Sequence, residues 1–225
     1  MRGNVLTALL LSDIHGRVSV LKNIVRKAEC DMAFVAGDVS NYSGGAYREV
    51  LEALAEVVPF TVAVPGNVDP PEVAELGINN VLVIHKQVVE VEKLYIAGIG
   101  GGIGFPFWGI PYLAEPHIAS FMRDLEKAVE QGPRALHVLV THTPPSMTSL
   151  DRVYSGEHVG SKKIRNFIET RKPLLHVCGH IHESRGVERI GETVAVNPGP
   201  AMTGYYGIAK FGENVREVSV ELLRV

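Results

Sequence analysis

The sequence has few cysteines, little net charge and no long hydrophobic run. Its two cysteines, Cys30 and Cys178, lie in or beside apolar segments and belong to no CxxC pair. This predicts two small buried side chains in a reducing cytosol. The formal net charge of −3 provides no basic field for long nucleic acid or for an anionic membrane. A nucleotide held at a local site is still compatible with that charge.

The apolar stretch at residues 5–11 is the segment that most resembles a targeting or membrane sequence. It is too short to span a bilayer, and no small-residue cleavage site precedes Asp13. We therefore interpret it as the first strand of a cytoplasmic protein. The 225 residues, 46% hydrophobic and 21% charged, suit a single domain over residues 1–225 without linker, repeat or low-complexity tract.

Apolar segments typical of strands recur along the chain and alternate with helix-like segments in its first half. The early ones are rich in Val, Leu and Ile, as expected for strands buried on both faces. The pattern predicts a mixed sheet in an α/β domain. We expect strands at 5–11, 32–36, 60–64, 81–84, 88–91, 94–97, 136–141, 174–178, 193–196, 206–211 and 215–220, and helices at 17–29, 46–57, 116–131 and 160–170, the last capped by Ser161.

Polar residues interrupt five of these strands at their carboxyl ends. In an α/β sheet such positions converge on one crevice, where ligands bind. Carboxylate, amide and imidazole groups are suited to Mn, Fe, Zn, Co or Ni. The set consists of Asp13 and His15 in LLLSDIHG, Asp38 in AFVAGDVS, Asn67 in TVAVPGNVD, His142 in HVLVTHTPP, and His180 and His182 in LLHVCGHIHE.

The spacing within this set is consistent with a metal site. Asp13 and His15 are two residues apart, as are His180 and His182, so in extended backbone each pair projects to the same side. A glycine directly precedes Asp38 and two other members, and glycine permits a sharp turn close to an ion. Each motif alone is also compatible with a turn, a cap or a structural polar pair. Their joint position at strand ends favours two adjacent metal ions.

Read in order, DIH, GD, GNVD, TH and GHIH resemble the signature of the calcineurin-like metallophosphoesterases. The resemblance spans residues 13–182 and continues into AVNPGP at 195–200. It implies an α/β fold in four layers, α-β-β-α, in which helices flank two mixed β-sheets. The strand and helix pattern is compatible with that fold but does not select it.

The resemblance also implies an activity. Two divalent ions would clamp a phosphate and lower the pKa of a bridging water, so that hydroxide attacks in line without a covalent intermediate. By motif position, Asp13, His15 and His182 would hold one ion, Asn67, His142 and His180 the other, and Asp38 would bridge both. The resemblance implies that Asp38, His142 and His180 would be the catalytic residues of this set.

The chain departs from the family pattern at Val68. Many members have a histidine there, which is thought to protonate the leaving group or to steady the transition state, and valine can do neither. Asp69 follows without that imidazole partner, so among the candidate catalytic residues it is assigned a supporting or structural role. A good leaving group, or a histidine from elsewhere in the chain, would compensate.

Two further segments offer substrate-binding groups. In residues 149–165, Arg152 would pair with phosphate oxygens and His158 would donate a proton, with Tyr154 between them; the alternative is a solvated loop before a helix. The Gly-rich segment 98–112 carries Phe105, Phe107 and Trp108. These aromatic side chains would form a wall for a nucleobase; the alternative is that they pack in the core or in a dimer contact. The other histidines lack motif partners and are expected to be ordinary surface or core residues: His85, His117, His137 and His176.

The hypothesis that follows is a phosphodiesterase that acts on a small phosphoester, with a nucleotide as one candidate, and that binds neither membrane nor long nucleic acid. A phosphomonoesterase is the second choice, and a protein phosphatase is disfavoured because no large insertion is present. A non-catalytic scaffold with the same fold is the rival from another class. Scaffolds typically lose metal ligands, whereas all seven positions here carry competent ones. Manganese is one candidate ion; metal identity, substrate and oligomeric state stay open.

Overall fold

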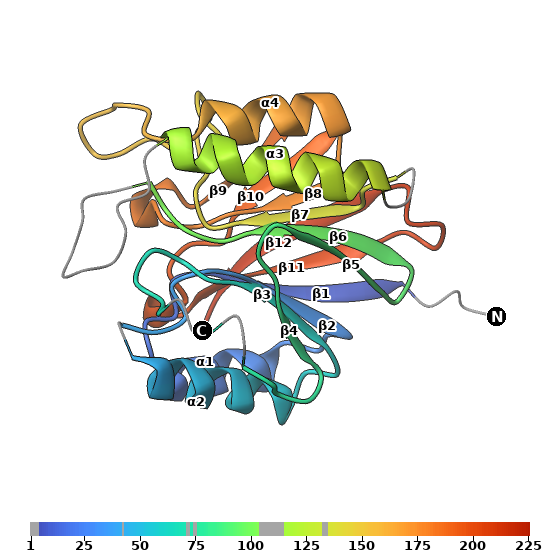
Figure 1. The fold of residues 1–225 in the computed structure, drawn as a ribbon. Helices are drawn as coiled ribbons and strands as arrows, with labels where there is room; N and C mark the ends of the chain where they lie inside the picture. Colours follow the sequence, from blue (N-terminus) through green and yellow to red (C-terminus); the bar gives the residue numbers. More distant parts are fainter. Residues whose placement is uncertain (1–4, 42, 71–72, 74–75, 104–114, 132–134) are drawn as a thin grey trace.

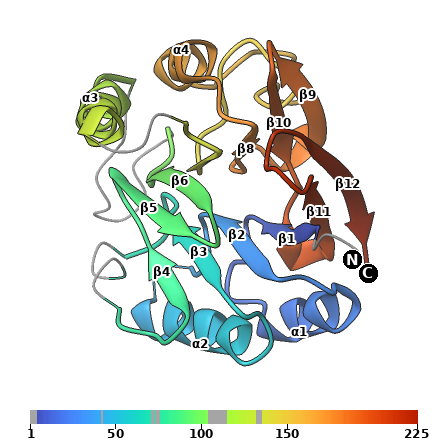
Figure 2. The ribbon, with the colours of Figure 1, turned by 90° about the vertical axis from the view of Figure 1, so that its right-hand side faces the viewer.

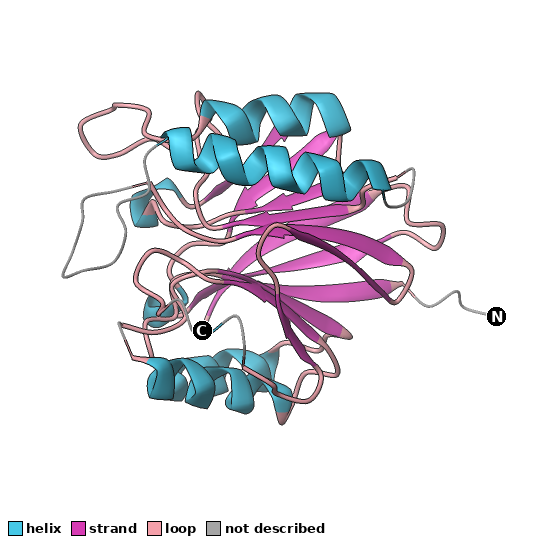
Figure 3. Cartoon of the chain, viewed as in Figure 1, coloured by secondary structure: helices cyan, strands magenta, loops and turns pink. Residues whose placement is uncertain are grey.

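The computed structural model describes residues 5–41, 43–70, 73, 76–103, 115–131 and 135–225. Two six-stranded sheets lie face to face, and two helices cover the outer face of each sheet (Figures 1 and 3). Helices α1 (Val18–Lys27) and α2 (Gly44–Ala55) cover the first sheet, while α3 (Glu115–Gln131) and α4 (Lys162–Arg171) cover the second. This is the four-layer α-β-β-α arrangement that the family resemblance implies.

The first sheet combines the N-terminal strands with the last two strands of the chain. Four parallel strands form one side of it, and two antiparallel strands extend it beyond β1. In spatial order they are β12 (Val218–Arg224), β11 (Tyr205–Phe211), β1 (Leu6–Leu11), β2 (Met32–Ala36), β3 (Thr61–Val64) and β4 (Val81–Val83).

The second sheet has four parallel strands in its centre and an antiparallel strand at each edge. In spatial order these are β5 (Gln87–Val91), β6 (Leu94–Ile99), β7 (Val138–Thr141), β8 (Leu175–Val177), β10 (Thr193–Asn197) and β9 (Gly186–Ile190). The parallel strands of both sheets that precede the polar motifs end on the same side of the molecule, on the left in Figure 1.

Three apolar layers hold the sandwich together. Within β1, Leu9 and Leu11 pack toward α1 and α2, whereas Ala8 and Leu10 pack between the two sheets. A third cluster lies between the second sheet and helices α3 and α4. Because successive residues of a strand point to opposite faces, a strand covered on both sides must be apolar throughout, which explains the unbroken hydrophobic run of β1.

The structure differs from the sequence-based prediction at one strand. β9 was not predicted, because it lies at the edge of its sheet and alternates exposed with part-buried positions, with Val187 44% exposed. All the predicted strands and helices are present, with boundaries shifted by a few residues. Within the described residues, no helix is long and apolar enough to cross a membrane.

Candidate metal centre

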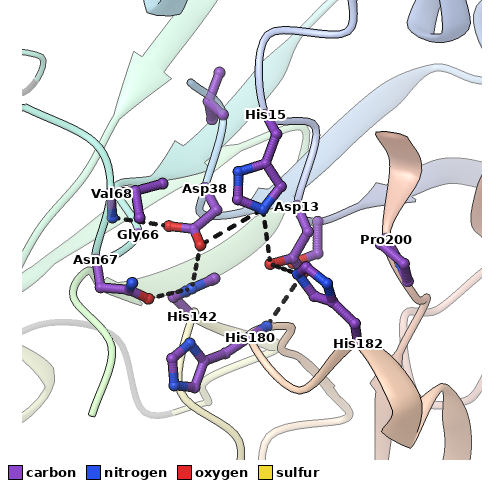
Figure 4. Close-up of polar contacts among 12 residues, drawn as sticks. Asp13, His15, Asp38, Gly66, Asn67, Val68, His142, His180, His182 and Pro200 are labelled. Atoms are coloured by element: carbon purple, nitrogen blue, oxygen red, sulfur yellow. Dashed lines mark hydrogen bonds and ion pairs between the residues drawn. The ribbon is translucent and has the colours of Figure 1, made fainter. Parts of the chain in front are cut away.

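The predicted metal ligands all lie just beyond the carboxyl ends of strands. Asp13 and His15 follow β1, and Asp38 and Asn67 follow β2 and β3 of the same sheet. His142 follows β7 of the second sheet, and His180 and His182 follow β8. The structure brings all seven side chains together in one cluster at the junction of the two sheets (Figure 4). The view of Figure 2, turned by 90°, shows the two sheets that supply them.

The first half of this cluster consists of Asp13, His15 and His182, which offer ligand atoms within 4.8 Å of one another. His182 Nε2 lies 3.1 Å from Asp13 Oδ1. The His15 ring contacts Asn41 Oδ1 through Nδ1 at 2.7 Å, which leaves Nε2 facing the cluster. That Nε2 atom is buried and has no hydrogen-bond partner among the described residues.

The second half consists of Asp38, His142 and His180, again with ligand atoms within 4.8 Å of one another, and Asn67 beside them. His142 donates from Nδ1 to the Ala36 carbonyl at 2.7 Å. Its Nε2 lies 2.9 Å from Asn67 Oδ1 and 3.2 Å from Asp38 Oδ2. Both of these oxygens are therefore aimed at the same ring nitrogen.

One oxygen of Asp38 is shared between the two halves. Asp38 Oδ2 lies 3.9 Å from His15 Nε2 and 3.2 Å from His142 Nε2 (Figure 4). The other oxygen, Oδ1, accepts a hydrogen bond from the backbone amide of Val68 at 3.1 Å. The amide fixes the carboxylate so that Oδ2 points between the halves, which is the placement a bridging ligand requires.

The donor set fits divalent ions, on two observations. The unpartnered Nε2 of His15 lies 3.9 Å from Asp13 Oδ1 and 3.9 Å from Asp38 Oδ2, so an ion between them would satisfy a buried atom. Around His142, burial opposes protonation, yet the neighbouring Asp38 carboxylate raises its pKa to about 9. The two oxygen atoms that face His142 Nε2 favour a positive charge at this nitrogen, either a bound proton or a metal ion in its place.

The backbone at four of these ligands adopts a conformation that non-glycine residues rarely take. Asp13, His15, Asp38 and His180 have φ of 54°, 50°, 51° and 69°, in the left-handed region. Such strain persists where the surrounding structure imposes it, and it clusters at functional sites. It turns the chain abruptly at each strand end and brings the side chains inward.

Glycines allow these strand ends to approach one another closely. A Cβ atom at Gly66 would overlap the Asp38 carboxylate, and one at Gly179 would overlap the Ser12 hydroxyl. No side chain larger than hydrogen fits at either position. The two glycines therefore set the close spacing of the cluster.

Asp69 lies behind the second half of the cluster and is 4% exposed. Its carboxylate accepts hydrogen bonds from the backbone amides of Val39, Ser40 and Gly66, at 3.1, 2.8 and 2.8 Å. Burial and the Asp38 charge raise the pKa of Asp69 to about 6. These contacts tie the turn after β2 to the turn after β3.

Arg152 and His158 lie outside this cluster, in a hairpin-like loop on the same side of the molecule (Figure 1). Arg152 donates from Nε to the Gly156 carbonyl at 3.3 Å. His158 Nδ1 lies 2.7 Å from the fully buried Asp151 carboxylate. Tyr154, 92% exposed, forms the tip of the loop. Phe105, Phe107 and Trp108 lie outside the described residues.

Several supporting groups were missed by sequence reasoning. Asn41 contacts His15, Ser12 Oγ donates to Asp13 Oδ2 at 2.5 Å, and the Ile103 carbonyl contacts His180 Nε2 at 2.5 Å. Nothing in their spacing marks them, because a backbone carbonyl or a small polar side chain near a ligand is set by tertiary packing. Asp151 had a local signal, since it lies seven residues before His158 within the same short loop.

The chain is similar to several known proteins in sequence and in fold. A sequence model of the calcineurin-like phosphoesterase superfamily domain matches residues 6–210. Uncharacterized protein MJ1162 of Methanocaldococcus jannaschii is 34% identical over 208 residues, covering 89% of this chain and 91% of that protein. Human metallophosphoesterase domain-containing protein 1 is 39% identical over 75 residues, covering 32% of this chain and 23% of that protein. The crystal structure of TT1561 of Thermus thermophilus has the same fold, with a TM-score of 0.71 at 20% identity and coverage of 97% of this chain and 99% of that chain.

Proposed function

This chain belongs to the calcineurin-like phosphoesterase superfamily, and on that premise we propose that it hydrolyses phosphoesters at a centre of two divalent metal ions. The observation that carries the proposal is the position of Asp38 Oδ2, which lies between His15 Nε2 and His142 Nε2. A carboxylate oxygen shared by two ligand clusters is the feature that makes a site binuclear rather than two separate sites. Residues 1–225 are proposed to form one such domain.

The roles of the ligands follow from the two halves of the cluster. Two divalent ions bound there would neutralise charge on the phosphoryl oxygens and lower the pKa of the attacking water. Around them, the Val68 amide and the Ala36 carbonyl fix the orientation of Asp38 and His142. Asp13, His15 and His182 would hold one ion, Asn67, His142 and His180 the other, and Asp38 both.

We place a phosphodiester first among substrates, and a small nucleotide is one candidate. Residue 68 carries no imidazole, so the group that protonates the leaving oxygen must come from elsewhere or be dispensable. A phosphomonoester is the alternative. Manganese is the first ion to test, because oxygen and imidazole ligands accommodate it. The unpaired Cys30 and Cys178 favour a cytoplasmic location.

His158 is the candidate proton donor. Its Nδ1 faces the buried Asp151 carboxylate at 2.7 Å, an arrangement that orients an imidazole and leaves Nε2 available. The loop that carries it is tied to the turn of His182, because the Tyr154 amide donates to Glu183 Oε1 at 3.1 Å. Arg152 would reach phosphate oxygens only by releasing the Gly156 carbonyl.

The experiment is hydrolysis of bis-p-nitrophenyl phosphate and p-nitrophenyl phosphate, each with added Mn²⁺ and each in EDTA. We expect Mn²⁺-dependent turnover that favours the diester and disappears in Asp38→Asn, which removes the shared charge at little change in size. A monoester preference would reassign the enzyme as a phosphatase. Absence of turnover on both compounds with two ions bound would favour the non-catalytic scaffold and overturn the catalytic proposal.

His158 is tested with diesters whose leaving groups differ in pKa. A proton donor matters most when the leaving oxygen is strongly basic. Methyl p-nitrophenyl phosphate releases p-nitrophenolate, a weakly basic leaving group, whereas a dialkyl phosphate must release an alkoxide. We therefore expect His158→Gln to slow hydrolysis of the first substrate much less than hydrolysis of the second. An equal loss on both substrates would assign His158 to loop structure alone.

A further inference from the structure

The backbone of Gly100–Ile103, directly after β6, lies against the second half of the metal centre. The Ile103 carbonyl contacts His180 Nε2 at 2.5 Å. Gly102 is so close that a Cβ atom there would overlap Asn67 Oδ1 and lie 3.0 Å from His142 Cδ2. Three of the proposed ligands of one ion therefore touch this short segment.

The contact with Ile103 determines which nitrogen of His180 is free to bind an ion. A carbonyl oxygen can only accept, so His180 must carry its proton on Nε2. Its lone pair is then on Nδ1, the ring nitrogen on the side of His142 in Figure 4. Metal-binding histidines commonly have their other nitrogen held in this way, which fixes both the tautomer and the ring orientation.

Side chains outside the ligand set hold this segment in place. The Thr143 hydroxyl accepts from the Ile103 amide at 3.1 Å and donates to the Gly101 carbonyl at 3.3 Å. Thr143 is fully buried, and its own carbonyl accepts from Thr141 Oγ1 at 2.6 Å. A further contact fixes the start of the segment, where the Gly100 amide donates to His85 Nδ1 at 3.0 Å.

We propose that Thr143 is a positioning residue for the second half of the metal centre. Its hydroxyl contributes no ligand atom. Through the Ile103 amide and the Gly101 carbonyl it holds the segment whose Ile103 carbonyl contacts His180 Nε2, which would leave Nδ1 free to bind an ion. The other half, formed by Asp13, His15 and His182, receives no hydrogen bond from Thr143. The inference rests on the proposed binuclear centre, and it predicts that losing this hydroxyl weakens one ion and spares the other.

The experiment is a Mn²⁺ titration of metal-depleted protein by isothermal calorimetry, with bound metal counted after gel filtration. Thr143→Val keeps the shape of the side chain and removes both hydrogen bonds, while Thr143→Ser retains the hydroxyl. Thr61→Val is the matched control, because Thr61 is also fully buried and its hydroxyl has no hydrogen-bond partner among the described residues. We expect Thr143→Val to lose about 10–100-fold in affinity for one of two ions, and both other variants to bind as wild type.

Several outcomes would overturn the proposal. Wild-type affinity for both ions in Thr143→Val, with a lowered urea midpoint, would assign the hydroxyl to fold stability alone. Equal weakening of both ions would show that the effect is not confined to one half. If Thr143→Val does not fold, Gly102→Ala tests the same segment, because its new Cβ would press on Asn67. Wild-type Mn²⁺ affinity at both sites of Gly102→Ala would reject the proposal. A wild-type protein that binds none of Mn²⁺, Fe²⁺, Zn²⁺, Co²⁺ and Ni²⁺ would instead refute the binuclear function itself.

Discussion

Val68 and Asp69 contact the candidate metal centre without belonging to its proposed ligands. The Val68 side chain cannot transfer a proton, yet its backbone amide directs Asp38. The Asp69 carboxylate accepts hydrogen bonds from three backbone amides and from the Ser40 hydroxyl. These bonds join the turn after β2 to the turn after β3, so the two turns stay fixed although residue 68 carries no imidazole.

Asp69→Asn tests this support. Asparagine has nearly the same size, but its amide group would face a backbone donor that now lacks an acceptor, and a buried unpaired donor costs about 1–3 kcal/mol. We expect Mn²⁺-dependent kcat/KM on bis-p-nitrophenyl phosphate to fall about 10–100-fold. Val68→Ala keeps the backbone amide, so it should lower kcat/KM far less. Equal effects of the two substitutions would contradict a special role for Asp69.

His176 is predicted to make the protein sensitive to acid. It is fully buried, and burial lowers its pKa from 6.5 to about 3, so the folded state favours the neutral ring. The unfolded state therefore takes up the proton first, and stability that is complete above about pH 6.5 is lost progressively as the pH falls toward 3. Between pH 7 and 5 this residue alone should cost about 2 kcal/mol.

The measurement is urea unfolding at pH 7 and pH 5 with EDTA throughout, in wild type and His176→Leu. Leucine leaves the bond from Thr141 Oγ1 to the Thr143 carbonyl in place. We expect the free energy of unfolding to fall less between the two pH values in the variant. An identical fall in both proteins would mean that His176 does not contribute to the acid sensitivity.

At the level of helices, Ser161 shows a local signal that predicts a boundary correctly. Its hydroxyl accepts from the Lys163 and Ile164 amides at 3.1 and 3.2 Å, and α4 begins at the next residue. Ser161→Ala should lower the free energy of unfolding by about 1 kcal/mol, since the Ile164 amide loses its acceptor, whereas the Lys163 amide still donates to Glu115 Oε1 at 2.9 Å. The control is Ser43→Ala at the start of α2, where one exposed bond of 3.3 Å is lost. A larger loss for Ser43→Ala would contradict this ranking.

The strands were predictable where burial on both faces makes them continuously apolar, as in β1 and β2. β9 was missed because only one of its faces packs. Its signal was the two-residue turn at 191–192, where Gly191 has a φ of 59° and closes a hairpin with β10. The strand order was not predictable from local patterns, because the pairing of β11 with β1 joins segments about 200 residues apart.

For the metal centre, motif order predicted the seven side chains that the structure brings together. The groups that orient them were not predictable, because they are backbone amides and carbonyls at Val68, Ala36 and Ile103. Every residue type carries these atoms, so only the packing of strand ends shows which of them face a ligand. The sequence therefore contains the chemistry of the site, and the fold supplies its geometry.

Considered as a whole, the molecule places its candidate metal centre across the junction of two sheets. The first sheet supplies Asp13, His15, Asp38 and Asn67, and the second supplies the remaining histidines. Bound ions would link the sheets at one end, while the apolar layer between them, which includes Leu10, links them along their length. Metal binding should accordingly stabilise the entire sandwich rather than one loop.

Thermal unfolding with and without Mn²⁺ tests this coupling. An ion present at 100 times its dissociation constant stabilises the folded state by about 2.7 kcal/mol per site, and about 2–4 °C of Tm corresponds to each kcal/mol at this chain length. We expect Mn²⁺ to raise the Tm by at least about 5 °C and EDTA to reverse the increase. Asp38→Asn should show a much smaller shift, since both ions lose the shared carboxylate, while Ser43→Ala should respond like wild type. A Tm that Mn²⁺ leaves unchanged would mean that Mn²⁺ does not join the two sheets.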